Sequence, residues 1–209
     1  DISYINDFIS PDQYLWGYPV AGGNMNYENS LLKAAVLDHI VLNEINGIRT
    51  KRLESISNAF REASIKVETP VNIIHWVWIH MAINAGVIST CLKYGGASAF
   101  MDSLAALKEG ILTIRETLKV AEARGVNLKQ FLAETSSFKI PTFISTRIMK
   151  RLFRKNIPVR QIMELHNNPD DLFELCTDVY NSISEYNISA PLFFAKSRYF
   201  LNQQRDRLN

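Results

Sequence analysis

Residues 69–92, TPVNIIHWVWIHMAINAGVISTCL, decide the fold of this chain. Thr69 is a typical N-cap and Pro70 suits a first helical position, so the stretch predicts a long helix that ends before Gly95-Gly96. Polar side chains interrupt its apolar run at Asn72, His75, His80 and Asn84. Four such groups are rare in a bilayer-spanning helix, which favours a helix buried inside a globular protein.

The chain that follows is helical in pattern. We expect helices at residues 98–124, 128–134, 142–155, 159–165, 168–185 and 191–204. Gly125 is expected to end the first of these, and Asn168-Pro169 to begin the fifth with an N-cap and an N1 proline. Together these patterns predict a compact all-helical domain.

The first quarter of the chain predicts β structure instead. A strand pattern at residues 13–20 leads into a predicted glycine turn at residues 21–24, and a second strand pattern at residues 34–42 precedes the turn signal Asn46-Gly47. Two strands cannot supply a stable sheet, so we expect them to be the remnant of a larger domain. The predicted division is a strand remnant at 1–47 and a helical domain at 48–209, where helix 51–63 and an extended link at 65–68 lead into the long helix.

Composition bounds the class of protein. The 209 residues are 47% hydrophobic and 21% charged, which is typical of a globular protein. A net charge of +2 gives no global electrostatic case for nucleic acid or an anionic membrane, and we expect neither as a partner. The chain opens without a signal-peptide pattern, and Cys91 and Cys176 lie in apolar helical patterns. We therefore expect buried free thiols and a cytoplasmic protein, with one disulfide as the alternative.

Polar residues recur every four positions along the long helix. Asn72, Trp76, His80 and Asn84 share one drifting stripe. An unpaired buried polar group costs roughly 1–3 kcal/mol, so these groups need partners. Those partners are either other protein groups or a ligand. The remaining histidines lack ligand spacing to a Cys, His or carboxylate, and we predict no metal.

The same helix resembles that of the ketopantoate reductase (2-dehydropantoate 2-reductase) family, which carries a Trp-x-Lys-x-x-x-Asn pattern. Trp78 and Asn84 match this pattern, and His80 stands where the family has its catalytic lysine. Upstream, residues 16–23 (WGYPVAGG) resemble the strand that closes the family's nucleotide domain. Residues 43–50 (NEINGIRT) resemble its Gly-Glu-x-x-Gly-x-x-Ser/Thr passage into the helical part. The ordered set covers nearly the whole chain.

The resemblance implies a mainly α fold: an all-helical C-terminal domain like that of 6-phosphogluconate dehydrogenase, preceded by a small β remnant of a Rossmann-type domain. It also implies an NADPH-dependent reductase of a small 2-oxo acid in pantothenate biosynthesis, with a homodimer as one assembly. No Gly-x-Gly-x-x-Gly follows a strand in this sequence. We therefore expect NADP to be held by an N-terminal nucleotide-binding domain that this chain lacks, and the chain alone to be inactive.

The resemblance also assigns roles to residues. His80 would be the general acid and Asn84 would orient the substrate. An unperturbed imidazole has a pKa of about 6.5, so it would be protonated at mildly acidic pH unless a carboxylate raised that value. The alternative is a buried structural histidine.

A third family landmark is a carboxylate that precedes an Ile-x-x-Pro ending, here residues 188–191. Counting back without gaps places it at Asp171, and a slide of one turn would choose Glu174. In the family this group binds the substrate's distal hydroxyl. Alternatively, Asp171 only complements the dipole at the start of its helix, and with Glu174 and Asp178 forms a solvated stripe.

An alternative function is a non-catalytic interaction or dimerisation module whose active site has drifted. The two departures from the family pattern, lysine to histidine and glutamate to aspartate, favour it. A basic run offers no third function, because it lacks the interleaved aromatics of a nucleic-acid patch. It fits one solvated helical face, partly paired with the acids at 164–178, and consists of Arg147, Lys150, Arg151, Arg154, Lys155 and Arg160.

Overall fold

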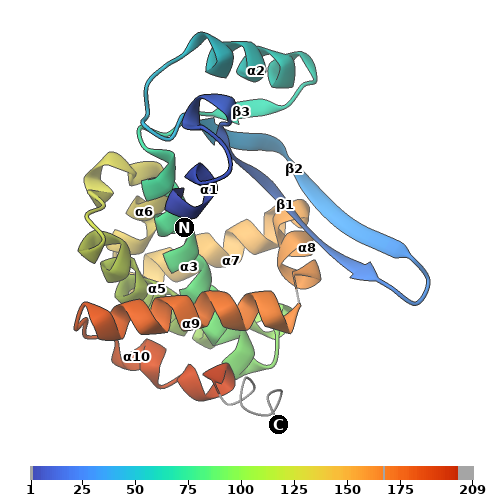
Figure 1. The fold of residues 1–209 in the computed structure, drawn as a ribbon. Helices are drawn as coiled ribbons and strands as arrows, with labels where there is room; N and C mark the ends of the chain where they lie inside the picture. Colours follow the sequence, from blue (N-terminus) through green and yellow to red (C-terminus); the bar gives the residue numbers. More distant parts are fainter. Residues whose placement is uncertain (1, 167, 202–209) are drawn as a thin grey trace. The chain divides into compact units, whose positions relative to one another are not determined.

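The computed structural model describes residues 2–166 and 168–201, and Figure 1 shows its course. The chain divides into two compact units. The sheet unit comprises Asp1–Ala21 and Val36–Val77, and the helical unit comprises Gly22–Ala35 and Trp78–Asn209. The mainly α fold with a small β part that the sequence predicts is confirmed.

Three elements belong partly to each unit, namely β1 (Trp16–Asn26), β2 (Leu31–Asn43) and α3 (Ile73–Tyr94). The sheet unit also holds α1 (Ile2–Asn6), η1 (Pro11–Gln13), α2 (Lys51–Glu62) and β3 (Lys66–Glu68). The helical unit holds α4 (Ala97–Asp102), α5 (Leu104–Ala123), η2 (Leu128–Gln130), α6 (Leu132–Lys139), α7 (Thr142–Lys155), α8 (Ile157–Leu165), α9 (Pro169–Glu185), α10 (Pro191–Phe194) and η3 (Ser197–Tyr199).

The sheet has three strands in the order β1-β2-β3. β3 pairs with β2 in parallel, with Ile40 opposite Val67, so α2 is the crossover of a β-α-β unit. The segment expected to be only an extended link is therefore a strand. This return of the chain is why the sheet unit extends to Val77, beyond the predicted division at residue 47. The predicted division at residue 47 concerns which residues correspond to the nucleotide-binding domain of other proteins. The division into two compact units does not test that prediction.

The predicted glycine turn at residues 21–24 is wrong, because β1 continues through it to Asn26. Figure 1 shows β1 and β2 as one long hairpin. The pair of glycines instead permits close packing: a Cβ on Gly22 would lie 2.7 Å from Cγ2 of Ile162, and one on Gly23 would lie 2.8 Å from the carbonyl oxygen of Lys33.

The hairpin turns six residues later than expected, at residues 27–30. The side-chain oxygen of Asn26 accepts hydrogen bonds from the backbone N–H groups of Glu28 at 2.9 Å and Asn29 at 3.3 Å. Ser30 takes a positive φ of 53°. A polar Asx-type turn therefore closes the hairpin, and not the glycine pair that the sequence indicated.

The long helix α3 begins at Ile73, not at the predicted Thr69-Pro70. Asn72 caps it, because its side-chain oxygen accepts the N–H of His75 at 3.0 Å. The carbonyl of Pro70 accepts the side-chain amide of Asn43 at 2.6 Å, which holds Pro70 in the preceding loop. The predicted end is confirmed: Gly95 and Gly96 follow Tyr94 with φ values of 85° and 131°.

Several downstream boundaries agree with the sequence. α7 spans Thr142–Lys155 as expected, and the side chain of Asn168 caps α9. The single helix expected at 98–124 is instead two, because Ser103 is an N-cap whose hydroxyl accepts the N–H of Ala106 at 3.2 Å. The helix expected at 191–204 is the short α10 followed by η3, and residues 202–204 lie outside the described residues.

α3 packs against α5 at very short range. A Cβ on Gly86 would lie 2.8 Å from Cγ1 of Ile114 and 2.9 Å from its Cα. One turn earlier, the hydroxyl of Thr117 donates to the carbonyl of Ala82 at 2.7 Å. The two helix backbones are therefore almost in contact, and only glycine fits between them at position 86.

α3 is also long and apolar enough to cross a membrane, judged by length and composition alone. However, 56% of its most apolar window is buried inside the protein. A core cluster packs around its C-terminal half, formed mainly with α9 and α10 by Ala85, Ile88, Val120, Phe173, Cys176, Val179, Ile183, Ala190, Phe193 and Phe200. This burial is what a core helix shows.

Replacing Gly86 with alanine should destabilise the protein by about 2 kcal/mol, although alanine has the higher helix propensity, because the backbone of α5 must move. Chemical denaturation would measure this loss. Gly17→Ala is the control, since its Cβ would come no closer than 3.4 Å to a neighbouring atom, Cδ1 of Leu42. Equal effects of the two substitutions would contradict the close helix contact.

The two cysteines, Cys91 and Cys176, are free and buried, and burial raises the pKa of each thiol to about 12. Because the thiolate is the reactive form, neither should react with a thiol reagent at mildly alkaline pH in the native protein. Both should react after denaturation. Fast labelling of the folded chain, followed by mass spectrometry, would count against this arrangement.

Candidate functional site

His80 and Asn84 lie four residues apart on the part of α3 that belongs to the helical unit. His80 is largely buried, and burial lowers its pKa from 6.5 to about 4. The imidazole is therefore neutral at neutral pH. Among residues 2–166 and 168–201, the side-chain amide of Asn84 forms no hydrogen bond, although Asn84 is only partly exposed.

The contact of α3 with α5 lies on its other side. Ala82 and Gly86 contact α5, and the thiol of Cys176 on α9 lies 3.9 Å from the carbonyl of Ala85. At about 100° per residue, Asn84 lies roughly 160° around the helix from Ala82 and Gly86, and His80 lies roughly 160° from Ala82 and 120° from Gly86. Ala85, which meets α9, lies roughly 140° from His80 but only about 100° from Asn84. His80 and Asn84 therefore lie on the side of α3 that faces away from α5.

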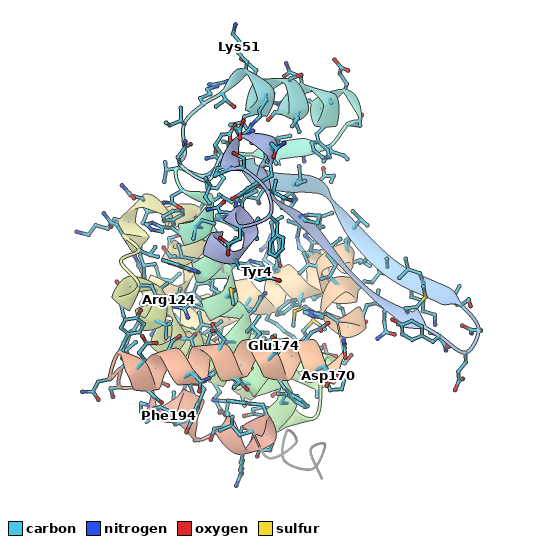
Figure 2. All side chains as sticks on the ribbon, in the orientation of Figure 1. Tyr4, Lys51, Arg124, Asp170, Glu174 and Phe194 are labelled. Atoms are coloured by element: carbon cyan, nitrogen blue, oxygen red, sulfur yellow. The ribbon has the colours of Figure 1, made fainter. Side chains whose placement is uncertain are left out.

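Trp78, the remaining residue that matches the family pattern, has a packing role. The guanidinium carbon of Arg124 lies 5.7 Å from the centroid of its ring. Arg124 also donates to Asp178 at 3.2 Å and to Ser182 at 2.6 Å, both on α9. This cation–π contact therefore ties α3 to α9 through the end of α5, where Figure 2 labels Arg124. Sequence reasoning missed Arg124, because a lone arginine before Gly125 carries no signal.

Asp171 lies in the first turn of α9, next to Asp170, which Figure 2 labels together with Glu174. It is exposed, and its carboxylate pairs with no other group in the described part of the chain. Cys176 is the residue of α9 that meets α3, and Asp171 lies about 140° around the helix from it. The structure therefore does not aim Asp171 at α3, and its binding role remains a prediction.

The passage that resembles the family's entry into the helical part is a structural anchor of the sheet unit. Glu44 is buried and accepts hydrogen bonds from Thr50 and from Nε of Arg52, the latter at 2.8 Å. Arg52 also donates to the carbonyls of Pro11 and Asp12. The hydrogen bond from Arg52 lowers the pKa of Glu44. These bonds fix the loop between β2 and α2.

A second buried polar cluster, which sequence reasoning also missed, centres on Lys196. Its ammonium donates to Thr113 at 2.8 Å and pairs with Glu109 at 2.8 Å. Glu109 in turn pairs with Lys93 at 2.8 Å and accepts from Tyr94 at 3.1 Å. Burial opposes the ionisation of Glu109, but the hydrogen bonds from Lys196 and Lys93 outweigh it and lower its pKa to about 2.

The basic run behaves differently from its prediction. Arg160 pairs with Glu164 at 2.9 Å and with Asp102 at 2.8 Å, and Lys150 pairs with Asp102 at 3.5 Å. Within the described part of the chain, no acid pairs with the other four members, which are Arg147, Arg151, Arg154 and Lys155. The expected pairing with the acids at 164–178 is therefore limited to Glu164.

The described residues offer no cradle for a dinucleotide. The βα turn of the β2-α2-β3 unit contains one glycine, Gly47, and the carboxylate of Glu44 there is occupied by Thr50 and Arg52. A dinucleotide-binding turn needs several glycines and free backbone N–H groups at the helix start. Over residues 2–166 and 168–201, no three His, Cys, Asp or Glu side chains gather to hold a metal ion.

Comparison with known proteins supports the fold. Neither a protein-family model nor a curated protein matches the sequence. Among solved structures, a D-mandelate dehydrogenase in complex with NADH matches all of this chain and 67% of its own, with 10% identity and a TM-score of 0.65. A 2-dehydropantoate 2-reductase from Geobacter metallireducens GS-15 matches 96% of this chain and 64% of its own, with 13% identity and a TM-score of 0.63.

A dimeric ketopantoate reductase from Staphylococcus aureus also matches, over 92% of this chain and 62% of its own, with 10% identity and a TM-score of 0.57. The resemblance expected from the sequence is thus confirmed as a shared fold. These neighbours are one dehydrogenase, solved with NADH, and two reductases. The chain spans about two thirds of the length of each neighbour.

Because of His80, the free energy of unfolding should fall as the pH is lowered. Its pKa is about 4 in the folded chain and about 6.5 when unfolded, so the unfolded state takes up the proton first. This loss is absent above pH 6.5, grows as the pH falls, and is complete below about pH 4, where it reaches about 3 kcal/mol.

Urea denaturation across this pH range would measure the effect. His80→Gln removes the titrating group and should flatten the corresponding part of the pH dependence. An unchanged slope in the variant would mean that another group carries it.

Proposed function

We propose that this chain provides the substrate side of an NADPH-dependent reductase of a small 2-oxo acid, ketopantoate-like. The proposal rests on the resemblance in which His80 and Asn84 match the family's lysine and asparagine, and on one observation: both lie on the side of α3 that faces away from α5. The shared fold with ketopantoate reductases supports it.

His80 acts on the keto oxygen. At neutral pH its imidazole is neutral, because burial lowers the pKa to about 4. A neutral imidazole donates one N–H hydrogen bond and so polarises the carbonyl. The substrate's own carboxylate, when bound nearby, raises the imidazole pKa by charge attraction. Substrate binding thus promotes the imidazolium form, which can deliver a proton to the developing alkoxide.

Asn84 orients the substrate. Its amide has both donor and acceptor groups and forms no hydrogen bond among the described residues, so it is available to a carboxylate or a hydroxyl. The predicted role of Asp171, binding a distal hydroxyl, requires the substrate to extend toward the exposed start of α9. Asp171 is therefore the weakest member of the proposed site.

The cofactor belongs to a part of the protein that this chain does not contain. Because the βα turn after β2 has no dinucleotide cradle, a separate nucleotide-binding domain would hold NADP and supply the hydride. The neighbour bound to NADH supports a nicotinamide dinucleotide, and the dimeric neighbour supports a homodimer. A cytoplasmic enzyme of pantothenate biosynthesis completes the proposal.

The alternative is a non-catalytic helical interaction or dimerisation module. The low pKa of His80 favours it, because a permanently neutral imidazole is a poor proton donor. The two functions make different predictions for His80: its pKa should change when a 2-oxo acid binds if the chain is part of a reductase, and should not change if the chain is an interaction module.

NMR titration of the His80 ring with and without ketopantoate tests the proposal. Without ligand the ring should titrate near pH 4. With ketopantoate bound, its pKa should rise by about 1 unit or more, because the substrate carboxylate stabilises the imidazolium.

Asn84→Ala serves as the control variant. It should leave the titration of the free protein unchanged and weaken ketopantoate binding about tenfold, the effect of losing one hydrogen bond to a charged group. A ring that titrates identically with saturating ketopantoate would remove His80 from the site and favour the interaction module.

A further inference from the structure

The outer face of α7 is more apolar than its inner face. Large apolar side chains are exposed on it, with exposed fractions of 61% for Phe143, 37% for Ile144, 46% for Ile148 and 45% for Leu152. The buried positions of α7 are Ser145, Thr146 and Phe153. A surface helix ordinarily places its apolar residues toward the core, so α7 has the reverse arrangement.

The hydroxyl groups on the inner face bond to nearby backbone rather than to the core. Thr146 donates to the carbonyl of Thr142 at 2.7 Å, and Ser145 donates to that of Ile140 at 3.3 Å. The packing of the helical unit therefore does not account for the large side chains on the outside of α7. Contiguous exposed apolar side chains of this kind mark a surface that binds something.

The charge on α7 is of one sign. It carries Arg147, Lys150, Arg151, Arg154 and Lys155 and no acid. Lys150 is paired, and the other four cations are exposed and meet no acid in the described part of the chain. At about 100° per residue, these four lie on the same half of the helix as the four apolar side chains. The net charge of +2 for the whole chain conceals this local accumulation.

The partner must supply negative charge and apolar contact within the same narrow strip. A second copy of α7 would bring two cationic faces together, which is repulsive. The acidic helix α9 has no Lys or Arg, and apart from Pro169 its exposed positions are polar: Asp170, Asp171, Glu174, Asn181, Ser184 and Glu185. If α9 of a second copy were the partner, its carboxylates would pair with the cations of α7. It would offer no apolar surface to Phe143, Ile144, Ile148 and Leu152.

An anionic bilayer surface supplies both requirements. Its headgroups bear the negative charge, and the acyl boundary a few ångströms below accepts apolar side chains. The long stems of arginine and lysine let the cations stay at headgroup level while neighbouring side chains insert. We propose that the outer face of α7, built from Phe143, Ile144, Arg147, Ile148, Arg151, Leu152, Arg154 and Lys155, binds peripherally to anionic lipid membranes.

Sedimentation of the full chain with lipid vesicles tests this binding. Vesicles of phosphatidylcholine with one third phosphatidylglycerol should bind the chain, and vesicles of phosphatidylcholine alone should not. Added salt should weaken the binding, because it screens the headgroup charge.

Two variants separate the charged and apolar contributions. R147E with R151E, and F143S with I148S, should each lower the fraction bound by about tenfold or more. The matched control is K51E with K108E, which makes the same charge change at two exposed lysines on α2 and α5 and should retain binding.

Three outcomes would overturn the proposal. The first is no binding to the anionic vesicles, and the second is full binding by either α7 variant. The third is an equal loss of vesicle binding in the control variant, which would mean that only the overall charge of the chain matters. Absent vesicle binding combined with a concentration-dependent mass that the α7 variants abolish would assign this face to a protein partner instead.

Discussion

The close approach of α3 to α5 is the contact on which the helical unit depends. Position 86 has room only for a glycine, since any side chain would meet the backbone of α5 at Ile114. The hydroxyl of Thr117 then bonds to the carbonyl of Ala82, which fixes the rotation of α3 about its own axis. That rotation determines which residues face α5 and which, like His80 and Asn84, face away from it.

The burial of His80 lowers the stability of the folded chain only below about pH 6.5, where the unfolded chain takes up a proton first. A buried imidazole loses solvation when it is charged, so the folded chain holds it neutral. Where the resembling family has a lysine, this chain has a group whose charge depends on what lies beside it. A perturbed pKa at a family position is typical of functional sites, although structural networks also produce it.

Charge is segregated between two helices, α7 and α9. α7 carries only cations and α9 only acids, yet no ion pair joins them in the described residues. The Lys196–Glu109–Lys93 cluster shows the opposite arrangement, in which opposite charges meet inside the unit and support its C-terminal end. The charges of the Lys196–Glu109–Lys93 cluster therefore stabilise the fold, whereas the charges of α7 and α9 lie at the surface.

The sequence by itself determined the helical class, the span of α7, and the cap and start of α9, because caps, proline and glycine act locally on the backbone. It also indicated His80 and Asn84 by their four-residue spacing. It could not determine that Gly22 and Gly23 are packing positions, that Asn72 rather than Thr69 caps α3, or that residues 66–68 form a strand. Each of these depends on which distant segment lies alongside. The pKa of His80, the contact of Trp78 with Arg124 and the exposed apolar face of α7 likewise follow from tertiary packing, because burial is set by neighbours far away in the sequence.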